Sequence, residues 1–283
     1  MPRREPLEIN GDRLLRDLRT LRTFGATGQG VVRPTFSDVD MQARQWLRDL
    51  MAEAGLDAAI DGVGNVVGRS PNAGPALLIG SHSDTQPTGG WLDGALGVVY
   101  GIEVARALLE HPATSGLAID AVAWSDEEAT YTSCLGSSSF VGALTEAKLR
   151  DTNSAGETVA AAIERVGLTT TPAVRIEPGR HVGYLEAHIE QGPHLEDGGL
   201  RIGVVTSIVG IRGARVEFRG EQNHAGTTPM ARRRDAGVAL FEFAVRLRER
   251  LSAAAGPTTV WTIGYANLEP GADSIIPGYA ELR

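Results

Sequence analysis

Apolar residues recur at helical spacing in the first part of the chain and then form short runs separated by helical stretches. Residues 12–22 and 38–54 each place apolar side chains on one face of a predicted amphipathic helix. After Gly55, short apolar runs predict strands and periodic stretches predict helices. The predicted strands cover residues 76–79, 117–124 and 183–189, and the predicted helices cover residues 95–109 and 158–166. This alternation predicts an α/β layer with a largely parallel central sheet.

The pattern changes near residue 208. Polar and apolar residues alternate over 211–219, a helical pattern follows at 231–253, and residues 258–265 again have the pattern of a strand. A β-α-β unit with one polar sheet face is typical of a small α+β domain. We therefore predict two domains, a larger α/β domain at residues 1–208 and a smaller α+β domain at residues 209–283.

The composition is that of an ordinary globular protein, with 283 residues of which 42% are hydrophobic and 22% charged. The formal net charge is -8 and no long segment is rich in Lys and Arg, which argues against a nucleic-acid partner. No window approaches the roughly 18 uninterrupted apolar residues of a membrane span. The charged N-terminus has no apolar segment typical of a secretory signal, so we expect a cytoplasmic protein. A single cysteine, Cys134, excludes an internal disulfide.

Candidate chemistry starts at His82, in Gly-Ser-His-Ser-Asp-Thr directly after an apolar run. Open α/β sheets present functional groups at this place. Asp84 can orient the imidazole, as carboxylates do for metal-bound histidines. Asp93 lies in a glycine-rich turn before the next predicted helix, where its carboxylate is uncovered and could bridge two cations.

Two further acidic segments lie at or near the ends of the next predicted strands. The acidic triplet at residues 126–128 places three carboxylates side by side. Their mutual repulsion is unfavourable unless a metal ion or solvent stabilises the negative charge. In the predicted strand that ends near residue 189, alternation places Glu186, His188 and Glu190 on one face. That face has the chemistry of a ligand set.

Each signal also has an ordinary structural explanation. A lone histidine is more often capped or solvated than a ligand, and we assign His111 and His181 to that class. An acidic triplet is usually a solvated turn, and Cys134 is expected to pack rather than to act as a nucleophile. The Gly-x-Ser-x-Gly and His-Glu-x-x-His motifs are absent from the sequence.

Four motifs follow one another along the chain. They are G-S-H-S-D-T-Q-P-T-G-G-W-L-D-G at residues 80–94, D-E-E at 126–128, E-A-H-I-E-Q-G-P at 186–193 and N-H-A-G-T-T-P-M at 223–230. Together they resemble the hydantoinase/carbamoylase-type amidases of the M20 metallopeptidase-like superfamily. This group includes N-carbamoyl-L-amino-acid hydrolases, allantoate amidohydrolases, ureidoglycolate-type amidases and β-ureidopropionases.

The resemblance implies a catalytic α/β domain that binds two divalent cations, of zinc, manganese, cobalt or nickel. It also implies that the second domain is a lid through which the protein forms a homodimer. His82 and His188 are then ligands of one cation, Asp93 bridges both cations, and Glu128 is a ligand of the second. The implied general base is Glu127, which takes a proton from the attacking water.

The resemblance also implies how a small substrate is held. Gln191 faces the ureido or amide group, and His224 faces the developing oxyanion. Ser274 stands where the family has an asparagine that contacts the substrate carboxylate. The implied reaction is the hydrolysis of a linear ureido or N-carbamoyl C–N bond, with release of ammonia and carbon dioxide.

Two alternatives stay open. Family members are longer, and the resemblance places their last metal-binding histidine in a segment beyond His224, after which this chain has no histidine. One alternative is therefore a truncated, weakly stable and catalytically inactive chain. The other is an aminopeptidase or dipeptidase of the same superfamily.

Overall fold

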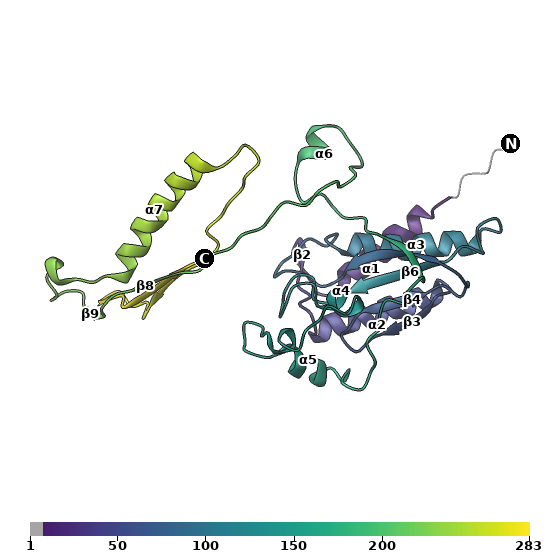
Figure 1. Cartoon of the computed structure of the whole chain (residues 1–283), viewed down its shortest axis with the longest axis horizontal. Helices are drawn as coiled ribbons and strands as arrows, with labels where there is room; N and C mark the ends of the chain where they lie inside the picture. The colour runs from purple at the N-terminus through teal and green to yellow at the C-terminus, as the bar shows by residue number, and fades with distance from the viewer. Residues whose placement is uncertain (1–7) are drawn as a thin grey trace. The chain divides into compact units, whose positions relative to one another are not determined.

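The computed structural model describes residues 8–283 and divides the chain into two units, Met1–Arg201 and Ile202–Arg283 (Figure 1). The division falls before residue 208, where the change in sequence pattern suggested a boundary. Residues 202–215, which begin the second unit, form neither helix nor strand.

A five-stranded mixed sheet forms the centre of the first unit. Across the sheet, the strand order is β3 (Asp57–Ile60), β4 (Val66–Arg69), β6 (Ile119–Trp124), β5 (Ala76–His82) and β7 (His181–Leu185). β5 is parallel to both β6 and β7, whereas β4 is antiparallel to both β3 and β6. The prediction of a largely parallel sheet is therefore wrong on one side of the sheet. The β3–β4 hairpin escaped prediction because strands of four residues carry little periodicity.

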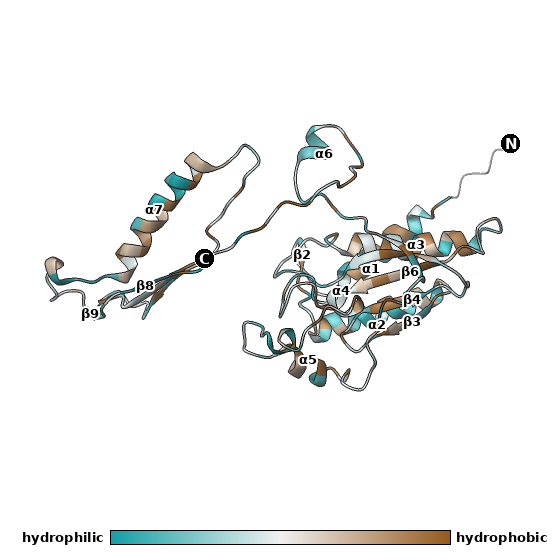
Figure 2. Ribbon diagram, in the orientation of Figure 1, coloured by the Kyte–Doolittle hydropathy of each residue, from teal (hydrophilic) through white to brown (hydrophobic). Residues whose placement is uncertain are grey.

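Three long helices pack on this sheet and on one another. They are α1 (Gly11–Thr23), α2 (Asp38–Glu53) and α3 (Ala95–Glu110), and they confirm the three longest predicted helices of this unit. The side chains of Asn10 and Ser37 accept hydrogen bonds from amides in the first turns of α1 and α2, which fixes where these helices begin. α3 packs on β5 and β6, α2 on β3 and β4, and α1 on α3. α3 is largely apolar along its length (Figure 2), as its burial requires.

The core lies between these helices and the sheet. Leu21, Leu47, Val98 and Ile102 are fully buried there, and each such side chain contributes about 1.5–3 kcal/mol. α3 approaches β5 very closely, because a Cβ atom on Gly101 would lie 2.7 Å from the carbonyl oxygen of Ile79. This close packing fixes the helix against the strand that ends in His82.

Shorter elements complete the first unit. They are β1 (Ala26–Thr27), β2 (Gly30–Val31), α4 (Leu135–Phe140), η1 (Lys148–Arg150), α5 (Val159–Arg165) and α6 (His194–Asp197). α5 confirms the helix predicted at 158–166, and β5 and β6 confirm the strands predicted at their positions. Phe36, Tyr131 and Leu135 form a second apolar cluster with residues of α5.

The second unit is a small α+β layer. Its sheet has the antiparallel order β10 (Ala266–Glu269), β12 (Tyr279–Leu282) and β8 (Val216–Arg219), and α7 (Ala236–Ala254) packs on β12 and β8. A separate antiparallel pair consists of β9 (Asn223–His224) and β11 (Ile275–Ile276), and η2 (Met230–Arg232) precedes α7. Leu240, Ala280 and Leu282 form the core of this unit.

Three predicted boundaries in the second unit are wrong. α7 begins at Ala236 rather than at 231, because the Asp235 carboxylate accepts from the amides of its first turn. The strand predicted at 211–219 is confined to β8, and residues 258–265 form no strand. In the first stretch only β8 pairs with a neighbouring strand. In the second, Gly264 and Tyr265 exchange backbone hydrogen bonds with Arg283, but this pairing does not extend into a strand.

The beginning of the second unit exposes apolar side chains. Those with at least 80% of their surface exposed are Ile202, Val204, Val205, Ile208, Val209 and Ile211. Within the described residues, none of the helices has the length and the apolar character needed to cross a lipid bilayer.

Candidate metal centre

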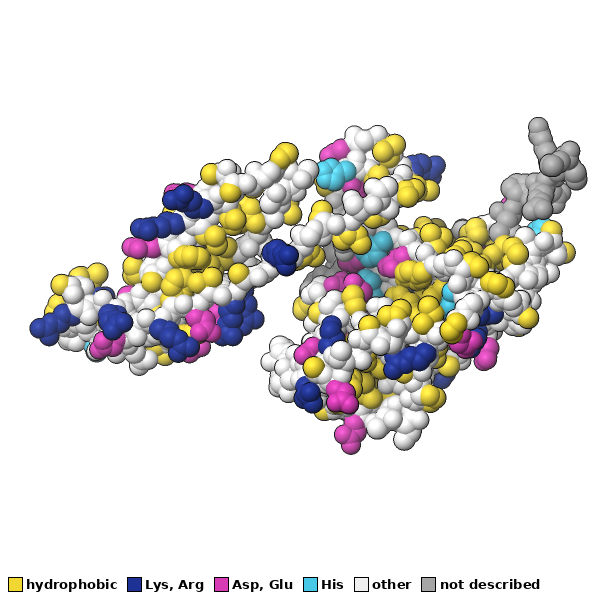
Figure 3. Space-filling view, in the orientation of Figure 1, with side chains coloured by type: hydrophobic (Ala, Val, Ile, Leu, Met, Phe, Trp, Pro, Cys, Tyr) yellow, Lys and Arg dark blue, Asp and Glu magenta, His cyan; other side chains and the backbone are white. Residues whose placement is uncertain are grey.

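The candidate site lies where parallel strands of the first unit end. His82 is the last residue of β5 and is in register with Trp124, the last residue of the parallel strand β6. The acidic triplet follows β6 directly, so the sheet brings it beside His82. The chain that leaves β7 carries His188 to the same edge. Figure 3 shows histidine and acidic side chains next to one another on the first unit.

Five predicted residues come together in two donor groups. His82, Asp93 and His188 form one group, and His82, Glu127 and Glu128 form the other. Within each group, one potential ligand atom of each residue lies within 4.8 Å of those of the other two. The sequence assigned the shared position to Asp93, whereas His82 is the residue common to both groups here. The bridging role of Asp93 stays a prediction.

The carboxylates of these groups lie close to the Nε2 atoms of the two histidines. The Asp93 Oδ1 atom lies 3.2 Å from His188 Nε2 and 4.0 Å from His82 Nε2. Glu127 Oε2 lies 3.7 Å from His82 Nε2. The two imidazole rings are 5.8 Å apart between centroids.

Backbone carbonyls hold both histidines in the form that binds a metal. His82 Nδ1 lies 3.0 Å from the carbonyl oxygen of Asp84, and His188 Nδ1 lies 2.9 Å from that of Ile189. A carbonyl oxygen can only accept, so each neutral ring carries its proton on Nδ1 and its lone pair on Nε2. Two such nitrogens facing carboxylates are a suitable donor set for a divalent transition-metal cation. The residues present therefore fit the cations that the sequence implies.

Asp84 supports the site in a different way from the one predicted. Its carbonyl, not its carboxylate, contacts the His82 ring, since Oδ1 is 4.0 Å from Nδ1. The Oδ2 atom instead accepts a hydrogen bond of 3.0 Å from the backbone amide of Glu128. Asp84 thus connects His82 with Glu128, a residue of the other strand's loop.

The acidic triplet divides into one structural and two site residues. Asp126 points inward and accepts hydrogen bonds from the amides of Tyr131 and Thr132, which closes the loop after β6. Burial raises the pKa of Asp126 to about 6. Glu127 and Glu128 face His82 instead. Partial burial raises the pKa of Glu127 above its ordinary value, with a smaller contribution from the charge of Glu128.

The predicted strand alternation around His188 is wrong. β7 ends at Leu185, and residues 186–190 form neither helix nor strand. Glu186 accepts hydrogen bonds from the hydroxyls of Ser81 and Tyr184, and Glu190 accepts from the amide of Leu195. Of the three side chains predicted to share a face, only that of His188 belongs to a donor group.

Gln191 lies beside the centre with a backbone conformation that favours glycine. Its φ angle is +57°, and its Nε2 atom donates to both carboxylate oxygens of Asp93, at 2.9 and 2.8 Å. The sequence predicts that this amide faces the substrate, a role that stays a prediction.

His224 and Ser274 belong to the second unit and are neighbours there. His224 of β9 is paired with Ile275 of β11, and the carbonyl of Ser274 accepts a 2.8 Å hydrogen bond from the Ala225 amide. His224 Nδ1 accepts a 3.0 Å hydrogen bond from the amide of Gly226. The neutral ring therefore carries its proton on Nε2, which is left as a hydrogen-bond donor.

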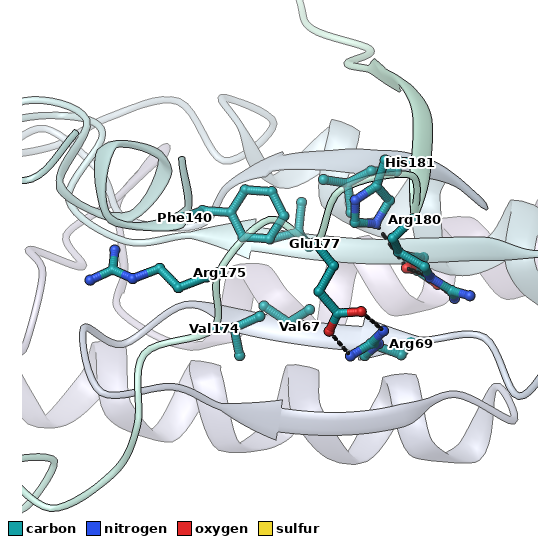
Figure 4. Close-up of a pocket in the computed structure, with 11 residues that line it drawn as sticks. Val67, Arg69, Phe140, Val174, Arg175, Glu177, Arg180 and His181 are labelled. Atoms are coloured by element: carbon teal, nitrogen blue, oxygen red, sulfur yellow. Dashed lines mark hydrogen bonds and ion pairs between the residues drawn. The ribbon is translucent and has the colours of Figure 1, made fainter. Parts of the chain in front are cut away.

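The cavity drawn in Figure 4 is separate from the donor groups. It lies over β4, β5 and β6, and two sets of its charged side chains pair with one another. Arg69 contacts Glu177 at 2.7 Å, and Asp120 contacts both Arg180 and His181. His181 therefore has a structural role, as expected for a histidine outside the motifs.

Two residues inside the first motif have contacts with the centre that were not predicted. Gln86 donates to Glu128, and Gly94, the residue before α3, has a φ angle of +64°. A Cβ atom on Gly94 would lie 2.5 Å from atoms of the His82 ring. The one sequence signal for these contacts is the position of both residues within the motif at residues 80–94.

We expect Gly94→Ala to displace the His82 ring and to weaken divalent-cation binding. The added methyl group meets the ring and also forces a non-glycine residue into a left-handed conformation, which costs about 1–2 kcal/mol. Titration calorimetry with Mn²⁺ and a thermal melt measure the two effects. Gly142, which also has a positive φ but open space around its Cβ position, provides the control Gly142→Ala. Equal cation affinity in the two variants would show that the Gly94 contact does not matter.

Comparisons with known proteins identify the family that this chain resembles in sequence and in fold. The model for Peptidase family M28 matches residues 64–163. The chain is 35% identical to an N-carbamoyl-L-amino acid amidohydrolase of Geobacillus stearothermophilus, over 97% of this chain and 68% of that protein. It is 36% identical to a ureidoglycolate hydrolase of Arabidopsis thaliana, over 98% of this chain but only 61% of that protein. The crystal structure of a hydantoinase/carbamoylase-family amidase from Burkholderia phymatum superimposes with a TM-score of 0.80 at 55% identity, covering 99% of this chain and 69% of that one.

The fold and the donor groups are those of a metal-dependent hydrolase. More specifically, the chain belongs to the hydantoinase/carbamoylase family of amidases, whose members hydrolyse linear amide or ureido C–N bonds.

Proposed function

We propose that this protein is an amidohydrolase that uses two divalent cations to cleave a linear ureido or N-carbamoyl group of a small acid. The observation that carries the proposal is the pair of histidine Nε2 lone pairs facing Asp93 and Glu127. The relatives that act on N-carbamoyl amino acids and on ureidoglycolate support the substrate class.

The donor groups would hold the cations, with His82 and His188 in one set and Glu128 in the other. When bound, such cations polarise the scissile carbonyl and make water easier to deprotonate. Glu127 accepts the proton of the attacking water at its carboxylate and delivers it to the leaving nitrogen. Water adds to the carbonyl carbon and one C–N bond breaks, which releases ammonia and leaves a carbamic acid. The carbamic acid then loses carbon dioxide, which breaks the second C–N bond and gives the free amine.

His224 and Gln191 are the proposed substrate contacts. The Nε2–H group of His224 suits the negative oxygen that develops on the carbonyl, because its Nδ1 atom is already occupied by the Gly226 amide. The Gln191 amide suits a ureido oxygen or nitrogen. Ser274, whose backbone lies beside His224, is the proposed contact for the substrate carboxylate.

The proposed assembly is a homodimer formed through the second unit. One face of α7 packs on the sheet, while Val238, Phe241 and Val245 expose about half of their surface at helical spacing on another face. Hydrophobic side chains gather along this helix in Figure 3. An exposed apolar stripe of this kind is typical of a protein interface.

A substrate panel tests the proposed function. The chain is reconstituted with Mn²⁺, Co²⁺, Ni²⁺ or Zn²⁺, its metal content is measured by elemental analysis, and ammonia release is followed with N-carbamoyl amino acids, allantoate and ureidoglycolate. We expect about two cations per chain and hydrolysis of at least one substrate. Metal-loaded protein that cleaves none of them is the outcome expected of an inactive chain.

A second candidate function is peptide hydrolysis, which the match to peptidase family M28 favours. Dipeptides therefore belong in the same panel. Cleavage of dipeptides without cleavage of ureido substrates would replace the proposed function by this one.

We expect His224→Ala to lower the rate of ureido hydrolysis by about 10²–10³-fold, as is typical for the loss of one oxyanion donor. Metal content should not change, since His224 lies outside both donor groups. Steady-state kinetics and elemental analysis measure the two quantities. His111→Ala is the matched control. A loss of bound metal in His224→Ala would assign this residue to the metal centre instead.

A further inference from the structure

Glu128 is held by two residues of the loop that follows β5. Gln86 Nε2 donates to the Glu128 carboxylate oxygen Oε2 at 2.9 Å and to its backbone carbonyl at 2.7 Å. The Asp84 carboxylate accepts from the Glu128 amide at 3.0 Å. Side chain and backbone of the same residue are thus both fixed by one neighbouring loop.

A buried charge lies behind this arrangement. The side chains of Asp84 and Arg44 are both fully buried, and Arg44 Nη2 lies 4.0 Å from Asp84 Oδ1. Neither of these two atoms has a hydrogen-bond partner among the described residues. Arg44 is itself fixed, because Nε donates to Asp40 and Nη1 to the carbonyl of Gly64, both at 2.7 Å. A buried carboxylate needs such a nearby positive charge, and the fixed Arg44 guanidinium places one beside Asp84.

We propose that Gln86 is a positioning residue that sets the divalent-cation affinity of the donor group His82, Glu127 and Glu128. The inference rests on the proposed two-cation function and adds the residue that orients one of its ligands. By binding Oε2, the Gln86 amide fixes the carboxylate plane and leaves Oε1 of Glu128 unrestrained by this contact. A ligand that is already oriented loses less side-chain entropy when a cation binds.

The other donor group has a corresponding glutamine. Gln191 holds the carboxylate of Asp93 as Gln86 holds that of Glu128. Each donor group therefore has one glutamine amide that holds a carboxylate. Loss of the Gln86 amide is expected to change the cation affinity of the group with Glu128 and not that of the group with Asp93. This difference separates positioning from a general loosening of the site.

The test measures cation affinity rather than activity. Gln86 is exposed, so Gln86→Leu removes the amide without disturbing the core. Titration calorimetry with Mn²⁺ and with Co²⁺, together with elemental analysis, compares Gln86→Leu with the unmodified chain. Glu128→Gln identifies which binding step uses Glu128. Gln29→Leu, at an exposed glutamine between β1 and β2, is the matched control.

We expect Gln86→Leu to weaken the Glu128-dependent step by about 10–100-fold, the usual loss when a ligand's hydrogen-bond partner is removed. The other step should stay within about twofold, and Gln29→Leu should change neither. Unchanged affinity in Gln86→Leu would overturn the positioning role and leave the proposed function intact. Equal weakening of both steps would also overturn it. A chain whose cation binding does not respond to Glu128→Gln would overturn both the positioning role and the two-cation centre.

Discussion

Glu127→Gln should lower the rate of ureido hydrolysis by about 10²–10⁴-fold while the metal content stays the same. The amide keeps the size of the side chain but cannot accept the proton of the attacking water. Glu128 and the two histidines stay available as ligands. Initial rates with an N-carbamoyl amino acid, together with elemental analysis, measure both quantities.

The pH dependence of the activity is a second test of the role of Glu127 as the general base. Partial burial raises the pKa of Glu127, so the carboxylate is protonated at a higher pH than an ordinary glutamate. Only the ionised form can act as a base, so activity should fall as the pH is lowered through this raised value. Glu146→Gln, at an exposed glutamate, is the control. A Glu127→Gln variant with the parent's rate would show that another group accepts the proton.

His82→Ala should remove cation binding from both donor groups at once. His82 is common to the two groups, and its loss takes the imidazole nitrogen that they share. The loss of affinity should exceed the 10–100-fold typical of removing a ligand's hydrogen-bond partner. Elemental analysis after dialysis against Mn²⁺ or Co²⁺ measures the effect, with His111→Ala as the matched control.

Asp93→Ala distinguishes the predicted from the observed arrangement. If Asp93 bridges two cations, as the sequence resemblance implies, the variant should lose both. If Asp93 serves only the group that contains His188, the variant should keep the cation held with Glu128. Retention of both cations by His82→Ala would contradict either arrangement.

The long elements of the fold could be predicted because they carry a complete pattern. α1 and α2 show apolar residues at helical spacing and an oxygen-bearing cap before the first turn. The orientation of β4 could not be predicted, because a strand of four residues does not reveal its direction. Residues 258–265 have a strand-like pattern, yet their backbone pairs with the end of the chain only at Gly264 and Tyr265, and a strand needs such hydrogen bonds along its length.

Much of the candidate centre could be predicted from motif order alone. His82, Asp93, Glu127, Glu128 and His188 come together because parallel strands end at one edge of the sheet. The contacts that orient these residues could not be predicted. The Asp84 carbonyl contacts His82, and the Gln86 amide contacts Glu128. The Gln86 contact depends on how two loops are placed in space, and neither contact can be read from the residue types alone.

The exposed apolar run from Ile202 to Ile211 affects how association in solution has to be interpreted. Its most exposed side chains are those of Val and Ile, it carries no charge, and its backbone forms no strand within the unit, so it can pair edge to edge with the same run of another molecule. Contacts of this kind are open-ended and grow with concentration, whereas a symmetric dimer through α7 stops at two chains. In size-exclusion chromatography, an apparent mass that continues to increase as the protein is concentrated therefore indicates association through this run. A profile that stops at twice the chain mass reports the dimer.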